Sequence, residues 1–145
     1  MKIKELLIGG VNLDSSLAHT GLLLLRVFTG LTLLFQHGLR KMPPSPRFVE
    51  TVGTLGFPLP ELFAWVAGLA EVIGGGLLAL GLFTRPAAAS ILFTMLVAAF
   101  GRHALDPFRE KELALTFACI AAVFLFIGSA RYGIDTMIRN RKDGS

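Results

Sequence analysis

Cysteine is nearly absent from this chain, and charged residues are sparse. Cys119 is the single cysteine of 145 residues, so neither an intramolecular disulfide nor a CxxC pair can form. This excludes membrane enzymes that generate disulfides through a thiol pair. Charged residues make up 17% of the chain and hydrophobic residues 53%, and the mean hydropathy is +0.65. Such a composition is too apolar for an ordinary soluble domain and indicates an integral membrane protein.

Three further patterns are missing. No β-barrel alternation occurs, which leaves helices as the structure that satisfies every backbone group in lipid. No secretory signal is predicted, because the apolar run at residues 6–8 is too short and no small-residue cleavage site follows the first long apolar stretch. The basic residues behind the net charge of +4 lie in tails and loops with little aromatic interleaving, so we expect no nucleic-acid partner.

Apolar segments long enough for membrane spans are present at residues 18–36, 60–83, 86–101 and 112–128. The last two fall slightly short of the ~20 residues that a span needs. Arg85 and Arg102 can snorkel outward from the ends of the third segment, and Asp106 with Pro107 can cap and start the fourth helix earlier. The sequence therefore predicts an all-α, polytopic membrane protein that folds as an antiparallel four-transmembrane-helix bundle.

The connection between the first two predicted spans has the pattern of a short interfacial helix. Ser45 and Pro46 can cap and start it, Gly56 can end it, and its apolar residues fall on one side, as expected at a membrane interface. These are Phe48, Val49, Val52 and Leu55.

The chain thus divides into an N-terminal tail (1–17), a four-helix membrane domain (18–135) and a basic C-terminal tail (136–145). An even number of spans places both termini on one side of the membrane. The basic cluster of Arg139, Arg141 and Lys142 favours the cytoplasmic side of the cell inner membrane.

Two opposite charges lie near the middle of separate apolar segments. Arg26 is at the centre of the first and Glu71 at the centre of the second. A lone charge at the bilayer midplane costs roughly 3 kcal/mol or more, so such residues usually pair inside a bundle. We therefore predict contact between Arg26 and Glu71, either as a salt bridge that fixes helix register or as a pair that also takes part in proton transfer or substrate contact.

Helix topology gathers further polar residues toward the membrane side opposite the termini. From Arg26 to His37 the rotation leaves a residual of about 20°, so both fall on one stripe of the first helix. We predict a polar pocket with Arg26 and Glu71 at its floor, in which a ligand contacts Arg26, His37, Lys41 and His103, and in which Glu71 and Glu112 exchange protons. Alternatives are interfacial hydrogen bonding by the histidines and a snorkelled Lys41. No HxxxH motif is present, so no metal site is predicted.

Three stretches resemble the DoxX family of small four-helix membrane proteins. They are FQHGLRKM at 35–42, GFPLPELFAWVAGLAEVIGGGLLALGLFTRPAA at 56–88 and RYGID at 131–135, and the resemblance runs from about residue 22 to 135. The family pattern falls on Arg26, His37, Gly38, Lys41, Glu71, Arg85, His103 and Glu112.

Some family members resemble a membrane subunit of an archaeal thiosulfate:quinone oxidoreductase, and another is associated with a membrane complex that contains a thiol-transfer enzyme and superoxide dismutase. The resemblance implies a quinone-linked, redox-associated membrane subunit whose basic pocket binds an oxyanion or a quinone carbonyl, with other oxidoreductase subunits as partners. We expect no covalently bound cofactor, because no flavin, haem or iron–sulfur motif is present and a redox centre would belong to a partner. A membrane scaffold that recruits soluble redox enzymes and a small-solute permease remain alternatives.

Overall fold

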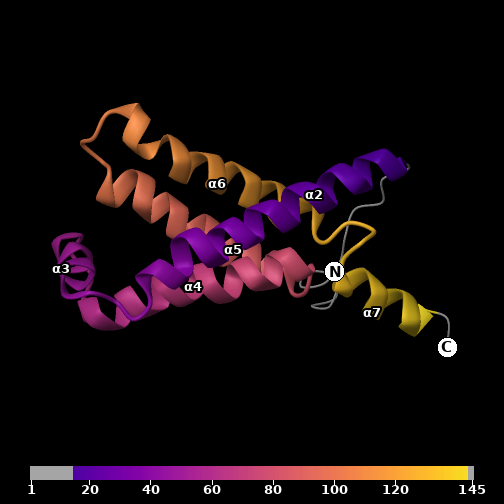
Figure 1. Cartoon of the computed structure of the whole chain (residues 1–145), viewed down its shortest axis with the longest axis horizontal. Coiled ribbons are helices and arrows are strands. Elements are labelled where there is room, and N and C mark those ends of the chain that lie inside the picture. Colours follow the sequence, from indigo (N-terminus) through magenta and orange to yellow (C-terminus); the bar gives the residue numbers. More distant parts are fainter. Residues whose placement is uncertain (1–14, 144–145) are drawn as a thin grey trace.

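The computed structural model of the chain describes residues 15–143, and all regular elements within that range are helical (Figure 1). Most of the predicted tail at 1–17, and Ser145 at the other terminus, lie outside the described residues. The elements, in chain order, are α2 (Ser16–Thr32), η1 (Leu33–Gly38), η2 (Leu39–Lys41), α3 (Pro46–Thr54), α4 (Pro60–Leu80), α5 (Thr84–Val97), η3 (Ala98–Arg102), α6 (Phe108–Ile127) and α7 (Ile134–Asp143).

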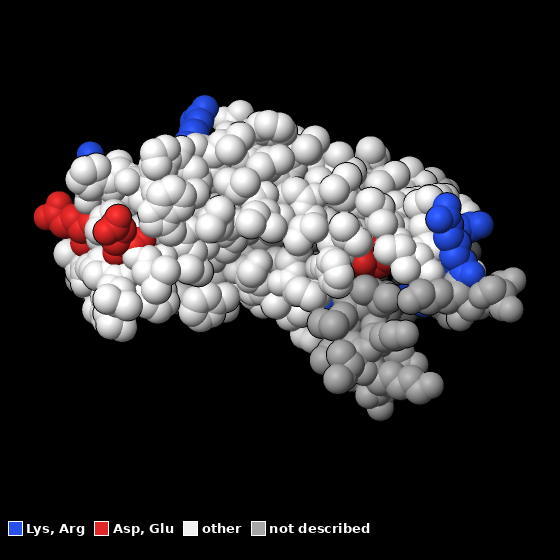
Figure 2. Space-filling model, turned by 90° about the horizontal axis from the view of Figure 1, so that it is seen from below, with Lys and Arg blue, Asp and Glu red and all other residues white. Residues whose placement is uncertain are grey.

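Among the described residues, three helical stretches are long and apolar enough to cross a membrane: Ser16–Lys41, Pro60–Leu80 and Thr84–Arg102. They correspond to the first three predicted spans. The fourth predicted span exists as the 20-residue helix α6, but charged residues crowd its first turns. On the face shown in Figure 2, charged side chains lie toward the two ends of the long axis and a broad uncharged belt separates them.

The four long helices lie side by side (Figure 1). Helix α2 packs along α4, α4 packs against α5, and α5 packs against α6. Leu33, Leu78, Ile91 and Phe124 form the fully buried centre, with 0% exposure each. Helix α3 lies at one end of this bundle, and α7 lies at the other end (Figure 1). The two ends of the bundle therefore differ, because α3 lies at one and α7 at the other.

Glycine sets the distance between α2 and α4. A Cβ atom added at Gly30 would lie 2.5 Å from the backbone oxygen of Gly75 and 2.6 Å from the backbone nitrogen of Ala79. The two backbones are thus in direct contact. Helices in lipid gain no hydrophobic driving force from associating, so small residues that allow close van der Waals packing hold them together. This contact fixes the antiparallel register of the two helices.

The local signals around α3 are confirmed. Ser45 is the N-cap, and its hydroxyl accepts a hydrogen bond from the backbone N–H of Phe48 at 3.3 Å. Pro46 occupies the first turn, and Gly56 follows the helix with φ 83°. Helix α6 also begins earlier than its apolar run, as predicted, but Pro107 rather than Asp106 holds the N-cap position.

The turn between α4 and α5 is held by a residue from the other end of the sequence. Asp135 accepts hydrogen bonds from the backbone N–H groups of Phe83 (2.8 Å) and Thr84 (2.9 Å), and from the Thr84 hydroxyl (2.8 Å). Helix α5 starts at Thr84, because this carboxylate satisfies N–H groups that a helix N-terminus leaves free. Asp135 is 1% exposed, so this is a buried structural contact.

Candidate functional site

The predicted contact between Arg26 and Glu71 is wrong, and the register of α2 against α4 explains why. A Cβ atom at Gly38 would lie 3.0 Å from the backbone of Glu71, whereas one at Gly81 would touch the Arg26 guanidinium. Glu71 therefore lies opposite Gly38. Gly38 follows Arg26 by twelve residues in the same helical stretch, so Glu71 and Arg26 are about 18 Å apart along the helix axis. Each charge finds its partners at a different end of the bundle, and Arg26 is not part of a pocket floor.

Arg26 is a structural residue at the end that carries α7. Its side chain is 2% exposed. Nη1 donates to the carbonyl oxygen of Ser129 at 2.6 Å, and Nη2 donates to that of Tyr132 at 3.1 Å. Asp135 supplies the opposing charge that acts on Arg26. The guanidinium thus ties α2 to the loop between α6 and α7.

Glu71 is paired with Lys41 instead. The distance from Lys41 Nζ to Glu71 Oε1 is 2.6 Å, and the side chains are 33% and 1% exposed, respectively. Glu71 Oε2 is buried and has no hydrogen-bond partner among the described residues. A carboxylate can accept several hydrogen bonds, so this oxygen is a free acceptor next to a partly exposed ammonium group.

Lys41 and Glu71 line a pocket of about 320 Å³. Its walls are mostly apolar and come from α3, α4, α5 and η3. The aromatic members are Phe48, Phe57, Phe63 and Phe93. Arg102 and His103 complete the polar part of the lining. The structure thus brings Lys41, Glu71 and His103 together from the predicted set.

The positive charges around the pocket are largely matched by carboxylates. Lys41 pairs with Glu71, and His103 Nδ1 lies 2.7 Å from Oδ2 of Asp106. Arg102 is the remaining cation in the lining. The pocket is therefore closer to neutral than the sequence suggested, and its polar groups are one lysine donor and one free carboxylate oxygen set among aromatic rings.

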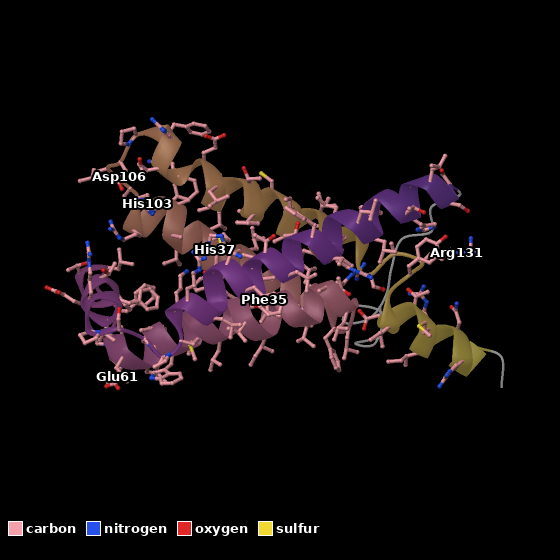
Figure 3. The ribbon with its side chains drawn as sticks, in the orientation of Figure 1. Phe35, His37, Glu61, His103, Asp106 and Arg131 are labelled. Atoms are coloured by element: carbon pink, nitrogen blue, oxygen red, sulfur yellow. The ribbon has the colours of Figure 1, made fainter. Side chains whose placement is uncertain are left out.

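The other predicted site residues lie outside the pocket. The His37 ring meets Phe117 of α6 edge-on, with centroids 5.4 Å apart. It is near enough to Glu71 and Lys41 for electrostatic interaction with both. Glu112 is exposed on the first turns of α6. Figure 3 shows His37, His103 and Asp106 toward one end of the molecule and Arg131 at the other.

Sequence reasoning missed the aromatic walls and Arg102, since neither follows a motif. One signal became visible only in the structure: η1 and η3 are π-helical, and both precede residues of the pocket. A π turn holds an additional residue, so the helical face shifts along the chain, and such turns are frequent at functional sites. The common stripe predicted from Arg26 to His37 therefore does not continue through η1.

The apolar helical stretches define a multi-pass membrane protein, and the pocket lined by Lys41 and Glu71 lies toward the end of the bundle that carries α3. The DoxX family pattern matches residues 21–104, and the chain belongs to the DoxX family. This range includes Lys41, Glu71 and His103 but not the RYGID segment at 131–135.

Two curated proteins are similar over most of their length. "Putative oxidoreductase CatD" of Bacillus subtilis (strain 168) is 29% identical over 127 residues, which are 86% of this chain and 92% of CatD. "Inner membrane protein YphA" of Escherichia coli (strain K12) is 34% identical over 94 residues, which are 64% of this chain and 67% of YphA. No solved structure matches this chain.

Proposed function

We propose that this protein is a membrane subunit of a quinone-linked oxidation system and that its pocket binds the ring of a quinone. The observation that carries the proposal is the Lys41 and Glu71 pair, which places one donor and one free acceptor oxygen in a pocket walled by aromatic side chains. Ligand pockets of this type use few polar groups to orient a mostly apolar ligand. The word oxidoreductase in the name of CatD agrees with this reading.

Each polar group has a distinct role in the proposal. The Lys41 ammonium has three N–H donors, of which one is used on Glu71 Oε1, and its partial exposure leaves the others available to a ring carbonyl. Glu71 Oε2 holds or releases a proton next to that carbonyl. A bound quinone accepts two electrons and two protons to become a hydroquinone. The electrons come from a redox centre of a partner oxidoreductase, and both protons come from water, passed on one after the other by Glu71, which is reprotonated between the two transfers.

The pocket favours a neutral carbonyl ligand over a free oxyanion. Lys41 already faces the Glu71 carboxylate, so an anion at this pair would meet a negative group in a site of low polarity. Removing an anion from water into such surroundings is costly unless an unpaired cation is buried with it, and Arg102, the remaining cation of the lining, is exposed. A quinone carbonyl needs only a hydrogen bond.

The proposed membrane arrangement has α6 as a fourth span, α3 at the interface and both termini in the cytoplasm of a cell with an inner membrane. Helix α3 lies at one end of the bundle, and the charged first turns of α6 lie at that same end. The arrangement is tested by thiol labelling in a Cys119→Ala background, where Ser45→Cys and Ser15→Cys should react from opposite sides. Reaction of both from one side would overturn it.

The ligand proposal is tested by quinone binding to the purified protein. Lipid extraction should recover a quinone that copurified with the wild type. Lys41→Met should weaken the binding of a short-chain quinone about 10- to 100-fold, because a hydrogen bond from a charged donor is lost. Lys111→Met is the matched control, since Lys111 donates to the carbonyl of Ala104 outside the pocket, and it should bind as the wild type does.

Loss of binding through misfolding is separated by a second variant. The double variant Lys41→Met with Glu71→Met removes both charges and should fold while still binding weakly. If the wild type binds no quinone, or if Lys41→Met binds as tightly as Lys111→Met, the pocket is not a quinone site. The scaffold function, in which the bundle only recruits soluble enzymes, would then be the better account.

A further inference from the structure

The lining of the pocket reaches the outer surface of the bundle. Two of its lining side chains, Val66 on α4 and Phe93 on α5, are 51% and 63% exposed. Both belong to helical stretches that are apolar and long enough to cross a membrane. The outer face of such a helix contacts hydrocarbon rather than water. Val66 and Phe93 therefore frame an opening between α4 and α5 that connects the pocket to the bilayer.

Helix α3 covers the pocket on its other side. Val52 of α3 is 6% exposed, and a Cβ atom at Gly101 would lie 3.4 Å from Cδ2 of Leu55. A second surface hollow shares Thr51, Leu55 and Arg102 with the pocket, so these three side chains form the wall between the two. A water-soluble ligand would have to pass this wall, whereas a ligand dissolved in the membrane would not.

The dimensions of the pocket match a ring but not a long tail. Its volume of about 320 Å³ is at the lower end of the roughly 300–1,000 Å³ found for ligand pockets. Along α5 and η3 it extends over ten residues, from Phe93 to Arg102, or about 13 Å for the nine steps between them. That is nearly half of the ~30 Å hydrocarbon core, so the opening lies well below the membrane surface.

We propose that the site takes a quinone that carries a hydrocarbon tail and that this ligand enters sideways from the bilayer between α4 and α5. The ring lies against Lys41 and Glu71, the tail leaves through the opening, and Val66 and Phe93 contact the tail. This inference rests on the proposed quinone function and names the form of the ligand. A water-soluble quinone without a tail would use the ring contacts alone.

Two quinones with the same ring, one with a ten-carbon tail and one without a tail, test the proposal in protein reconstituted into vesicles. Trp65 is the only tryptophan of the chain and precedes Val66, so its quenching by quinone reports binding. Val66→Phe should narrow the opening and weaken the tailed quinone about tenfold or more, and it should weaken the tail-less quinone far less. Ile73→Phe is the control, because Ile73 is 54% exposed on the same helix and lies outside the pocket lining.

The outcomes separate this inference from the proposed function. If Val66→Phe changes neither quinone, or weakens both equally, the tail does not use this opening, although ring binding to the wild type would still support the quinone function. If the wild type binds neither quinone, the quinone function itself fails. If mass spectrometry of the purified protein finds a phospholipid that Val66→Phe releases, the opening holds a lipid chain and the proposal is overturned.

A second measurement uses the wild type alone, in case Val66→Phe does not fold. A quinone with a photoreactive diazirine on its tail should attach to peptides of α4 and α5 that contain Val66 and Phe93. Attachment to α3 peptides instead would place the tail toward the aqueous side and would overturn sideways access.

Discussion

Removing the Lys41 and Glu71 charges one at a time and then together should show strong coupling between them. The pair is joined at 2.6 Å, and Glu71 is almost completely buried. Lys41→Met leaves that carboxylate without a partner, and stranding a buried charge costs about 3 to 5 kcal/mol. Glu71→Met leaves a lysine that is one-third exposed and whose long side chain can extend toward the end of the bundle, so its cost should be smaller, about 1 to 2 kcal/mol.

The double variant should be more stable than Lys41→Met alone. Methionine approximates the shape of either side chain, and replacing a buried ion pair by apolar groups of similar volume is often nearly neutral. The free energy of unfolding should be measured by denaturant titration in one detergent for the wild type, both single variants and the double variant. The expected order of destabilisation is Lys41→Met, then Glu71→Met, then the double variant.

A second cycle with Arg26→Met and Glu71→Met is the control. These residues are about 18 Å apart along the helix axes, and substitutions at such separations usually add within about 0.5 kcal/mol. If the Lys41 and Glu71 losses simply add, the two side chains do not interact as the structure shows. Coupling between Arg26 and Glu71 would instead restore the contact that the sequence suggested and would overturn the register of α2 against α4.

Substitutions at three packed sites, two of them with a matched control variant, test the remaining contacts. Gly75→Ala should lower the free energy of unfolding by about 1 to 3 kcal/mol, because its Cβ would lie 2.8 Å from a backbone oxygen of α2. Gly76→Ala is the control, since its Cβ meets open space; in thermal unfolding it should be neutral or stabilising by up to about 1 kcal/mol. Arg26→Met should lower the free energy of unfolding by about 3 kcal/mol, because it leaves two carbonyls without donors. Arg131 is exposed, so Arg131→Met should change it by no more than about 0.5 kcal/mol. Equal losses in the two variants would contradict the buried contacts of Arg26. Asp135→Asn should lower unfolding stability by about 1 to 3 kcal/mol, and an unchanged midpoint would show that this carboxylate does not hold the α4–α5 turn.

Sequence patterns determined the helices of this protein because their causes are local. Long apolar runs predict spans, since a chain in lipid must satisfy its own backbone groups. Ser45, Pro46 and Gly56 predicted the start and end of α3 through capping and φ preferences that act within a few residues. The close approach of α2 to α4 at glycines also follows a local rule, because only small residues allow it.

The partners of the buried charges were decided by tertiary structure. A matching position in two apolar segments is a poor guide to contact between two charges. Which residues of α2 and α4 lie opposite each other depends on where the glycines of the two helices meet, not on the centre of each segment. The π turn in η1 also shifted the helical face of the residues that follow it, and no residue pattern predicted this turn.

The pocket itself also needed the tertiary structure. Its walls combine α3, α4 and α5, which are separate in sequence, so their aromatic side chains carry no shared motif. Asp135 likewise reaches the α4–α5 turn from 51 and 52 residues away. Sequence alone predicted that Arg26 and Glu71 would be buried and would need partners, but not that Asp135 would be. Helix register and long-range packing determined which partners the buried charges found.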